Sequence, residues 1–129
     1  MALVLPSLLL ALAAQGDPAK DLRSKDFAVR LQAIEILAAS GEDKEASKLL
    51  VASLKDDDWE VVEAAIDALG KVAGKGADKK LLDLALDAPL MRHRRAAARA
   101  LATGYGAEAW IQLEKKMSSK TAVPAAQAA

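Results

Sequence analysis

The sequence contains no cysteine and a single histidine, His93, and each shortage excludes a class of chemistry. Without cysteine there is no disulfide, no thiolate nucleophile and no sulfur-ligated zinc site. One histidine rules out a paired-histidine metal site and leaves little for a Ser/His catalytic arrangement. We therefore expect no catalytic residue, no metal and no cofactor.

Aromatic residues make up 3% of the chain, and neither sign of charge predominates. The 18 basic and 18 acidic residues cancel, so no net field draws the protein toward nucleic acid or an anionic membrane. The 129 residues have a hydrophobic content of 53%, which is enough for one domain with a core. Because Ala and Leu dominate that content, the composition predicts closely packed helices rather than strands.

The N-terminal segment from Ala2 to Ala14 is apolar but too short to span a bilayer, which needs about 20 residues. Ala11 and Ala13 supply the small-x-small pattern of a signal peptidase site. Residues 1–13 are therefore predicted to be a signal peptide, which makes the protein periplasmic or secreted and leaves no stable membrane insertion after removal. No Lys or Arg precedes the apolar run. The alternative is a helix that caps the fold of a cytoplasmic protein.

From Phe27 onward the chain repeats itself with a period of 32 residues. The segments FAVRLQAIEILAASG, WEVVEAAIDALGKVAG and MRHRRAAARALATGYG align, so that Phe27, Trp59 and Met91 coincide, as do Ala33, Ala65 and Ala97, and Leu37, Leu69 and Leu101. This spacing is typical of the buried stripe of an amphipathic helix. A second series keeps the same step through Leu49, Leu81 and Leu113. Each unit is therefore predicted to contain two helices.

The expected helices lie near 28–39, 44–54, 59–73, 78–87, 91–103 and 107–117, after a first half-unit near 17–24. Gly41, Gly74, Gly76, Gly104 and Gly106 follow the second helix of each unit, where a left-handed turn favours glycine. A lone helix pair cannot bury both faces, whereas stacked pairs can. We predict an all-α, right-handed α-solenoid of about three and a half units over residues 17–117, followed by a disordered tail, 118–129.

Several residues within these units resemble the HEAT repeat, in the short form common in bacterial proteins and in the bilin-lyase-type HEAT-like group. The resemblance rests on the turn acids Asp26 and Asp58, on Val29-Arg30, and on AAIDALG with its counterparts QAIEILA and AAARALA. It implies an acid–arginine ladder between adjacent repeats. Val62 replaces the arginine of the second unit and Leu90 the aspartate of the third, while Arg94 is retained. The ladder is therefore expected to be partial.

The contiguous acids Asp56, Asp57 and Asp58 are interpreted as a helix start. Asp58 is predicted to accept from the free amides of the first turn. A calcium loop would need acids at alternating positions and a glycine at the sixth, and this cluster lacks both. Trp59 is expected to pack under the turn, as its equivalents Phe27 and Met91 do, with an aromatic ligand platform as the alternative.

The solvent face of the second helices is the candidate binding surface. On a helical wheel it carries Leu31, Glu35, Glu63, Asp67, Arg95 and Arg99. Equivalent residues of neighbouring repeats lie roughly 10 Å apart, so Glu63 and Asp67 are expected to reach toward Arg95 and Arg99. This face is either a partly paired, solvated surface or a site that recognises an acidic partner.

The resemblance and this surface favour a non-enzymatic module that binds another protein, with self-association through an exposed end also open. The rival interpretation is a subunit of an enzyme complex, since HEAT-like solenoids resemble those of bilin lyases and of certain DNA-base glycosylases. Catalysis would need a convergent constellation of side chains, and none is evident. Zero net charge and an export signal disfavour nucleic acid as the ligand.

Overall fold

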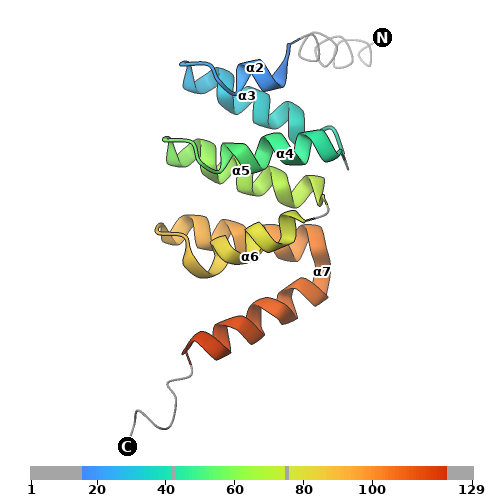
Figure 1. Cartoon of the computed structure of the whole chain (residues 1–129), viewed down its shortest axis with the longest axis vertical. Helices are drawn as coiled ribbons and strands as arrows, with labels where there is room; N and C mark the ends of the chain where they lie inside the picture. The colour runs from blue at the N-terminus through green and yellow to red at the C-terminus, as the bar shows by residue number, and fades with distance from the viewer. Residues whose placement is uncertain (1–15, 42, 75, 122–129) are drawn as a thin grey trace, which may run out of the picture.

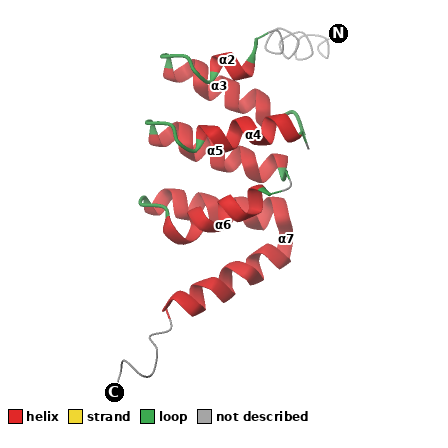
Figure 2. Cartoon of the chain, in the orientation of Figure 1, coloured by secondary structure: helices red, strands yellow, loops and turns green. Residues whose placement is uncertain are grey.

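The computed structural model describes residues 16–41, 43–74 and 76–121, and within these ranges every regular element is a helix (Figures 1 and 2). The helices are α2 (Pro18–Asp21), α3 (Phe27–Ala38), α4 (Lys44–Ser53), α5 (Trp59–Val72), α6 (Ala77–Asp87) and α7 (Met91–Thr121). The predicted all-α solenoid is confirmed, and the predicted bounds of α3 to α6 are each within one residue of those observed. We call α2, α4 and α6 the first helices, and α3, α5 and α7 the second helices.

Aspartate side chains cap the N-termini of three of these helices. The carboxylates of Asp17, Asp26 and Asp43 accept from the amides two residues ahead, at 3.1, 2.9 and 2.9 Å. Each contact satisfies one of the amides that a helix N-terminus leaves without a partner, and it stabilises the helix by about 1 kcal/mol. The regular recurrence of these caps fixes where each helix of the stack begins.

The second helices stack side by side, and the first helices pack against them (Figure 1). The predicted stripe of Leu37, Leu69 and Leu101 is buried, as is the matching alanine series. The largest fully buried side chains are Ile34, Leu50, Val61, Ile66, Leu69, Val72, Leu81 and Leu101. Because these residues come from both kinds of helix, one continuous core runs along the stack, as expected for repeats that bury their faces against neighbours.

The helix ends differ in part from the prediction. Gly41, Gly76 and Gly106 adopt positive φ angles of 72°, 89° and 74°, which glycine tolerates because it has no Cβ. After α5, however, the left-handed residue is Ala73, at φ 49°, rather than the predicted Gly74. Gly104 likewise lies inside α7 and ends no helix.

Helix α7 consists of two helical parts that meet at Gly106, where φ is 74° and ψ is −163° (Figure 1). These parts correspond to the predicted helices near 91–103 and 107–117. The second part runs to Thr121, so the predicted disordered tail starts four residues too early. Lys120 forms an ion pair with Asp87, and this contact favours the extra helical turn.

The predicted signal peptide, 1–13, and the rest of the predicted tail, 122–129, lie outside the described residues and stay predictions. Within the described part of the chain, no helix combines the length and the apolar character needed to cross a bilayer.

Candidate functional site

Arg30 joins the first repeat to the second through two carboxylates of the intervening turn. Its guanidinium forms an ion pair with Asp58, and its Nε lies 3.1 Å from Oδ2 of Asp56. Its Nη1 also donates to the carbonyl oxygen of Ser24 at 2.8 Å. The Arg30 side chain is only 13% exposed, so this network is largely shielded from water. The partial ladder expected from the sequence is confirmed at this step of the stack.

The ladder changes the role predicted for Asp58. This residue precedes α5 in the extended conformation of a helix cap, but its side chain accepts no amide of the first turn. Its carboxylate binds Arg30, which offers a full positive charge in place of a neutral amide. Asp56 instead accepts from the Asp58 amide at 2.9 Å. Among the described residues, no group of three acidic or imidazole side chains is placed to hold a metal ion.

At the next step of the stack the ladder is absent, as the sequence indicates. Val62 is buried, and Leu90 is 43% exposed. The Nε atoms of Arg94 and of its equivalent Arg30 are both buried without a hydrogen bond in the described part of the chain, but only that of Arg30 lies beside a carboxylate, at 3.1 Å from Asp56. No acid follows it where Asp58 follows Arg30. The arginine is therefore retained without the acceptor that would satisfy it.

Trp59 does not pack under the turn as predicted. Its side chain is 41% exposed, and the guanidinium carbon of Arg92 lies 3.7 Å from the ring centroid. This is a cation–π contact, in which the guanidinium covers one face of the ring. His93 donates from Nε2 to the Trp59 carbonyl oxygen at 2.9 Å, because a carbonyl can only accept. Trp59 and Met91 occupy equivalent positions of adjacent repeats. The repeat alignment could therefore have shown that Arg92, the residue after Met91, lies close to Trp59.

The candidate surface carries two ion pairs between α5 and α7. Arg92 Nε lies 2.6 Å from Oε2 of Glu63, and Arg99 Nη2 lies 3.9 Å from Oδ1 of Asp67. The predicted pairing of Asp67 with Arg99 is confirmed. The predicted reach of Glu63 toward Arg95 is wrong, since Arg92 takes this carboxylate. We call Glu35, Glu63, Asp67, Arg92, Arg95 and Arg99 the second-helix face.

Two members of this face, Glu35 and Arg95, are exposed and form no ion pair with any described residue. Leu31 departs from the prediction, because its side chain is partly buried and packs against the hydrophobic core. A cavity of about 380 Å³ between α3 and α5 is lined by Glu35 and Asp67. Burial raises the pKa of Asp67, and the Arg99 guanidinium acts against that shift.

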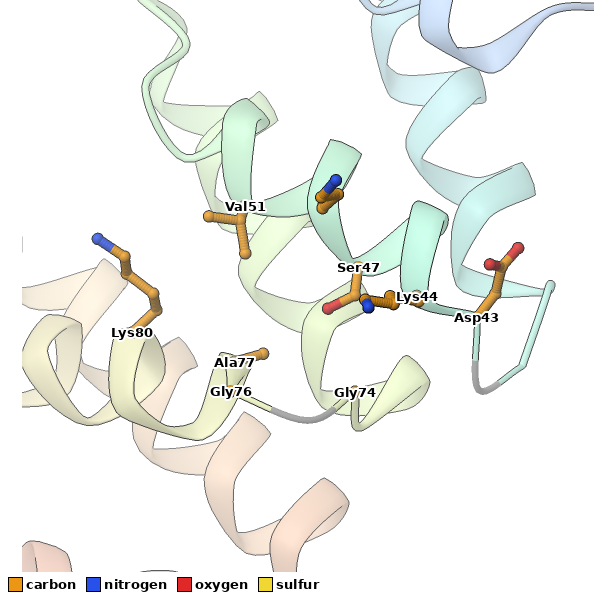
Figure 3. Close-up of a pocket in the computed structure, with 9 residues that line it drawn as sticks. Asp43, Lys44, Ser47, Val51, Gly74, Gly76, Ala77 and Lys80 are labelled. Atoms are coloured by element: carbon orange, nitrogen blue, oxygen red, sulfur yellow. The ribbon is translucent and has the colours of Figure 1, made fainter.

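A second hollow, absent from the sequence prediction, lies between α4 and α6 (Figure 3). Two adjoining cavities of about 750 and 530 Å³ share Lys48, Val51 and Lys80 as lining residues. We call them together the α4–α6 groove. Lys44, Ser47, Lys48 and Val51 follow the helical spacing i, i+3, i+4 and i+7, so the sequence indicates that they share a face. What the sequence did not indicate is that α4 and α6 stand far enough apart to leave this face open.

A family model described as HEAT repeats matches residues 18–102, which cover α2 to the first part of α7. No curated protein and no solved structure matches the chain. The matched region is well over half of the 129 residues and contains every repeat step described above. The chain therefore belongs to the HEAT repeat family.

Proposed function

We propose that this chain is a non-enzymatic scaffold that binds another protein across its second-helix face. HEAT repeats generally mediate protein–protein interaction. In this chain the recognition surface would be a row of acidic and basic side chains presented by successive repeats.

The observation that carries the proposal is the division of charge along the second-helix face. Glu63 and Asp67 on α5 are each paired with an arginine of α7, whereas Glu35 and Arg95 are exposed without an ion pair among the described residues. A partner that offers a cation near Glu35 and a carboxylate near Arg95 would therefore meet unpaired charges of the opposite sign. Such complementarity raises the association rate and fixes the register of docking.

Export forms part of the same proposal. The apolar run before residue 14 and the Ala11-x-Ala13 pattern support a protein that acts in the periplasm or outside the cell, after residues 1–13 are removed. The intact mass of the native protein tests this point, since cleavage after Ala13 and retention of the segment give different masses.

The binding test compares charge reversals on and off the second-helix face. The mature protein and its variant Arg95→Glu/Arg99→Glu are each immobilised. The proteins that each captures from the native cell envelope are then identified and compared. Loss of a partner with this variant, at an unchanged melting temperature, is the expected result, because exposed pairs contribute less than about 1 kcal/mol to folding.

The control is Lys115→Glu/Lys116→Glu, which makes the same change in net charge on the exposed second part of α7. Capture that responds equally to both double variants would reflect net charge alone and would contradict a site on the second-helix face. Capture that ignores both would place the binding surface elsewhere. Binding to duplex DNA that falls steeply with salt would replace the proposal with a nucleic-acid function.

A further inference from the structure

The wider part of the α4–α6 groove has a marked excess of positive charge. Lys44 and Lys48 from α4 and Lys80 from α6 line this cavity of about 750 Å³, and none of them forms an ion pair with a described residue. Among the described residues, the one acid in the lining is Asp43, whose carboxylate already accepts from the Glu45 amide at 2.9 Å. The described lining therefore offers three unneutralised cations around one partly engaged carboxylate.

A hydroxyl on the wall of this cavity forms no hydrogen bond within the described part of the chain. Ser47 is 8% exposed, yet its Oγ makes no hydrogen bond with any described residue. Ser53, six residues further along α4 and also buried, donates to the Leu49 carbonyl at 3.0 Å instead. Figure 3 shows the Ser47 oxygen turned toward the space between α4 and α6. The Oγ is not among the fully buried atoms that lack a partner, so it faces the cavity and its donor is available to a ligand there.

The N-terminus of α6 opens at the same end of the cavity. Unlike α2, α3 and α4, this helix has no side-chain cap, because Gly76 occupies the cap position. Its first-turn carboxylate, Asp78, lines a different cavity beside Tyr105 and so does not neutralise the helix end on this side. The amides and the dipole of an uncapped helix N-terminus attract anions.

We propose that this end of the α4–α6 groove binds an organic phosphate, through Lys44, Lys48, Lys80, the Ser47 hydroxyl and the N-terminus of α6. A phosphate monoester carries a charge of about −1.5 to −2 at pH 7 and offers three strong acceptor oxygens, which match several cations and two kinds of neutral donor. A carboxylate carries a single charge and only two oxygens. The chemistry of the donors therefore favours the phosphate.

The size of the cavity indicates that the phosphate is part of a larger molecule. Pockets of roughly 300–1,000 Å³ are typical of sites for small organic ligands, and this one also has apolar walls at Val51 and Ala77. The adjoining cavity of about 530 Å³ extends the groove toward Leu84 and Pro89. The organic part of the ligand would lie along this apolar strip. This site is separate from the second-helix face, so either can fail without the other.

The test is a titration of the mature protein with phenyl phosphate at pH 7, followed by the amide NMR shifts, with chloride added to hold the ionic strength constant. Inorganic phosphate and benzoate are titrated in parallel. We expect saturable shifts confined to the N-terminal halves of α4 and α6, with phenyl phosphate binding at least threefold more tightly than either of the other two probes.

Two pairs of variants separate the site from general attraction to lysines. Ser47→Ala and Lys80→Gln should each weaken phenyl phosphate binding at least fivefold. Their controls are Ser53→Ala, which removes a hydroxyl already bonded within α4, and Lys79→Gln, which removes an exposed neighbouring charge outside the cavity lining. Both controls should bind as the parent does.

Three results would overturn the proposal. Shifts that rise without saturation at all lysine-rich surfaces would show nonspecific screening. Benzoate bound as tightly as phenyl phosphate would show that the site does not select phosphate. Ser47→Ala and Lys80→Gln proteins that melt like the parent and still bind phenyl phosphate normally would place its binding outside this groove.

Discussion

The carbonyl oxygen of Gly70 occupies the space beside Gly104, so that a Cβ added to Gly104 would lie 2.2 Å from it. Helices α5 and α7 therefore cross with their backbones in contact, which only a residue without a side chain allows. We expect Gly104→Ala to lower the free energy of unfolding by about 3 kcal/mol, since backbone must move to relieve the clash. Urea denaturation measures the change.

The same substitution also improves helix propensity, by about 1 kcal/mol. If the crossing could open without cost, Gly104→Ala would stabilise the protein, which would contradict the close approach. Ala102→Gly, at an exposed position of the same helix, serves as the reference for propensity alone.

Arg30 and Arg94 occupy equivalent positions but differ in their partners, and this difference predicts opposite responses to the same substitution. Arg30→Met removes the contacts with Asp56, Asp58 and the Ser24 carbonyl, and should lower the free energy of unfolding by about 2 kcal/mol. Arg94→Met removes a buried Nε that has no carboxylate beside it among the described residues, and should change this free energy by less than about 1 kcal/mol, or raise it. Equal losses in the two melting curves would contradict the partial ladder.

Ala73 ends α5 in the left-handed conformation, at φ 49° and ψ 38°. A Cβ disfavours this conformation, so Ala73→Gly should raise the free energy of unfolding by about 1 kcal/mol. Ala39, at the corresponding end of α3, has an ordinary right-handed conformation at φ −81°. Ala39→Gly should therefore lower stability, and thermal melts of the two variants should shift in opposite directions.

The titration of Tyr105 makes the free energy of unfolding depend on pH in the alkaline range. Its hydroxyl donates to the Gly74 carbonyl at 2.6 Å, and burial, followed by the nearby Asp78 charge, raises its pKa from 10.0 to about 12. Because the unfolded chain releases this proton first, the stabilising contribution of Tyr105 is complete below pH 10 and is lost between pH 10 and 12. Tyr105→Phe should be less stable than the parent by about 1 kcal/mol at pH 8, and the difference should shrink as the pH rises to 12.

The pKa of Asp67 reports whether the ion pair between Asp67 and Arg99 on the second-helix face forms in solution. Burial raises its pKa above 3.8, while Arg99, 3.9 Å away, lowers it. Removing that cation in Arg99→Ala should therefore raise the pKa of Asp67 further. Carbon NMR of the carboxyl group measures this shift, and an unchanged pKa in the variant would mean that the pair does not form in solution.

The fold was predictable because the residues that become buried recur at regular intervals in the sequence. Leu37, Leu69 and Leu101 recur every 32 residues, and the same step locates both helices of each unit. Helix ends were less predictable, since Ala73 adopts a conformation that composition assigns to glycine. The last turn of α7 depends on Lys120 meeting Asp87, a contact between segments that no local pattern indicates.

The candidate surface was predictable by face but not by partner. A helical wheel shows which side a residue occupies, whereas pairing also depends on how far one helix is displaced along its neighbour. That displacement brings Arg92 to Glu63 and leaves Arg95, one turn further along α7, unpaired. The α4–α6 groove was missed for a similar reason, because the separation of two helices is a property of packing and not of either sequence segment.

The contact of Arg92 with the Trp59 ring gives the protein an optical reporter of its own assembly. Trp59 opens the second full repeat and Arg92 belongs to the third, so Arg92 covers one face of the ring only while these repeats are docked. Separation of the third repeat would expose this face of the partly exposed indole to water as well and move its fluorescence emission to longer wavelengths. With Trp110, the other tryptophan, replaced by Phe, emission would follow the docking of these two repeats, while circular dichroism follows the helices themselves.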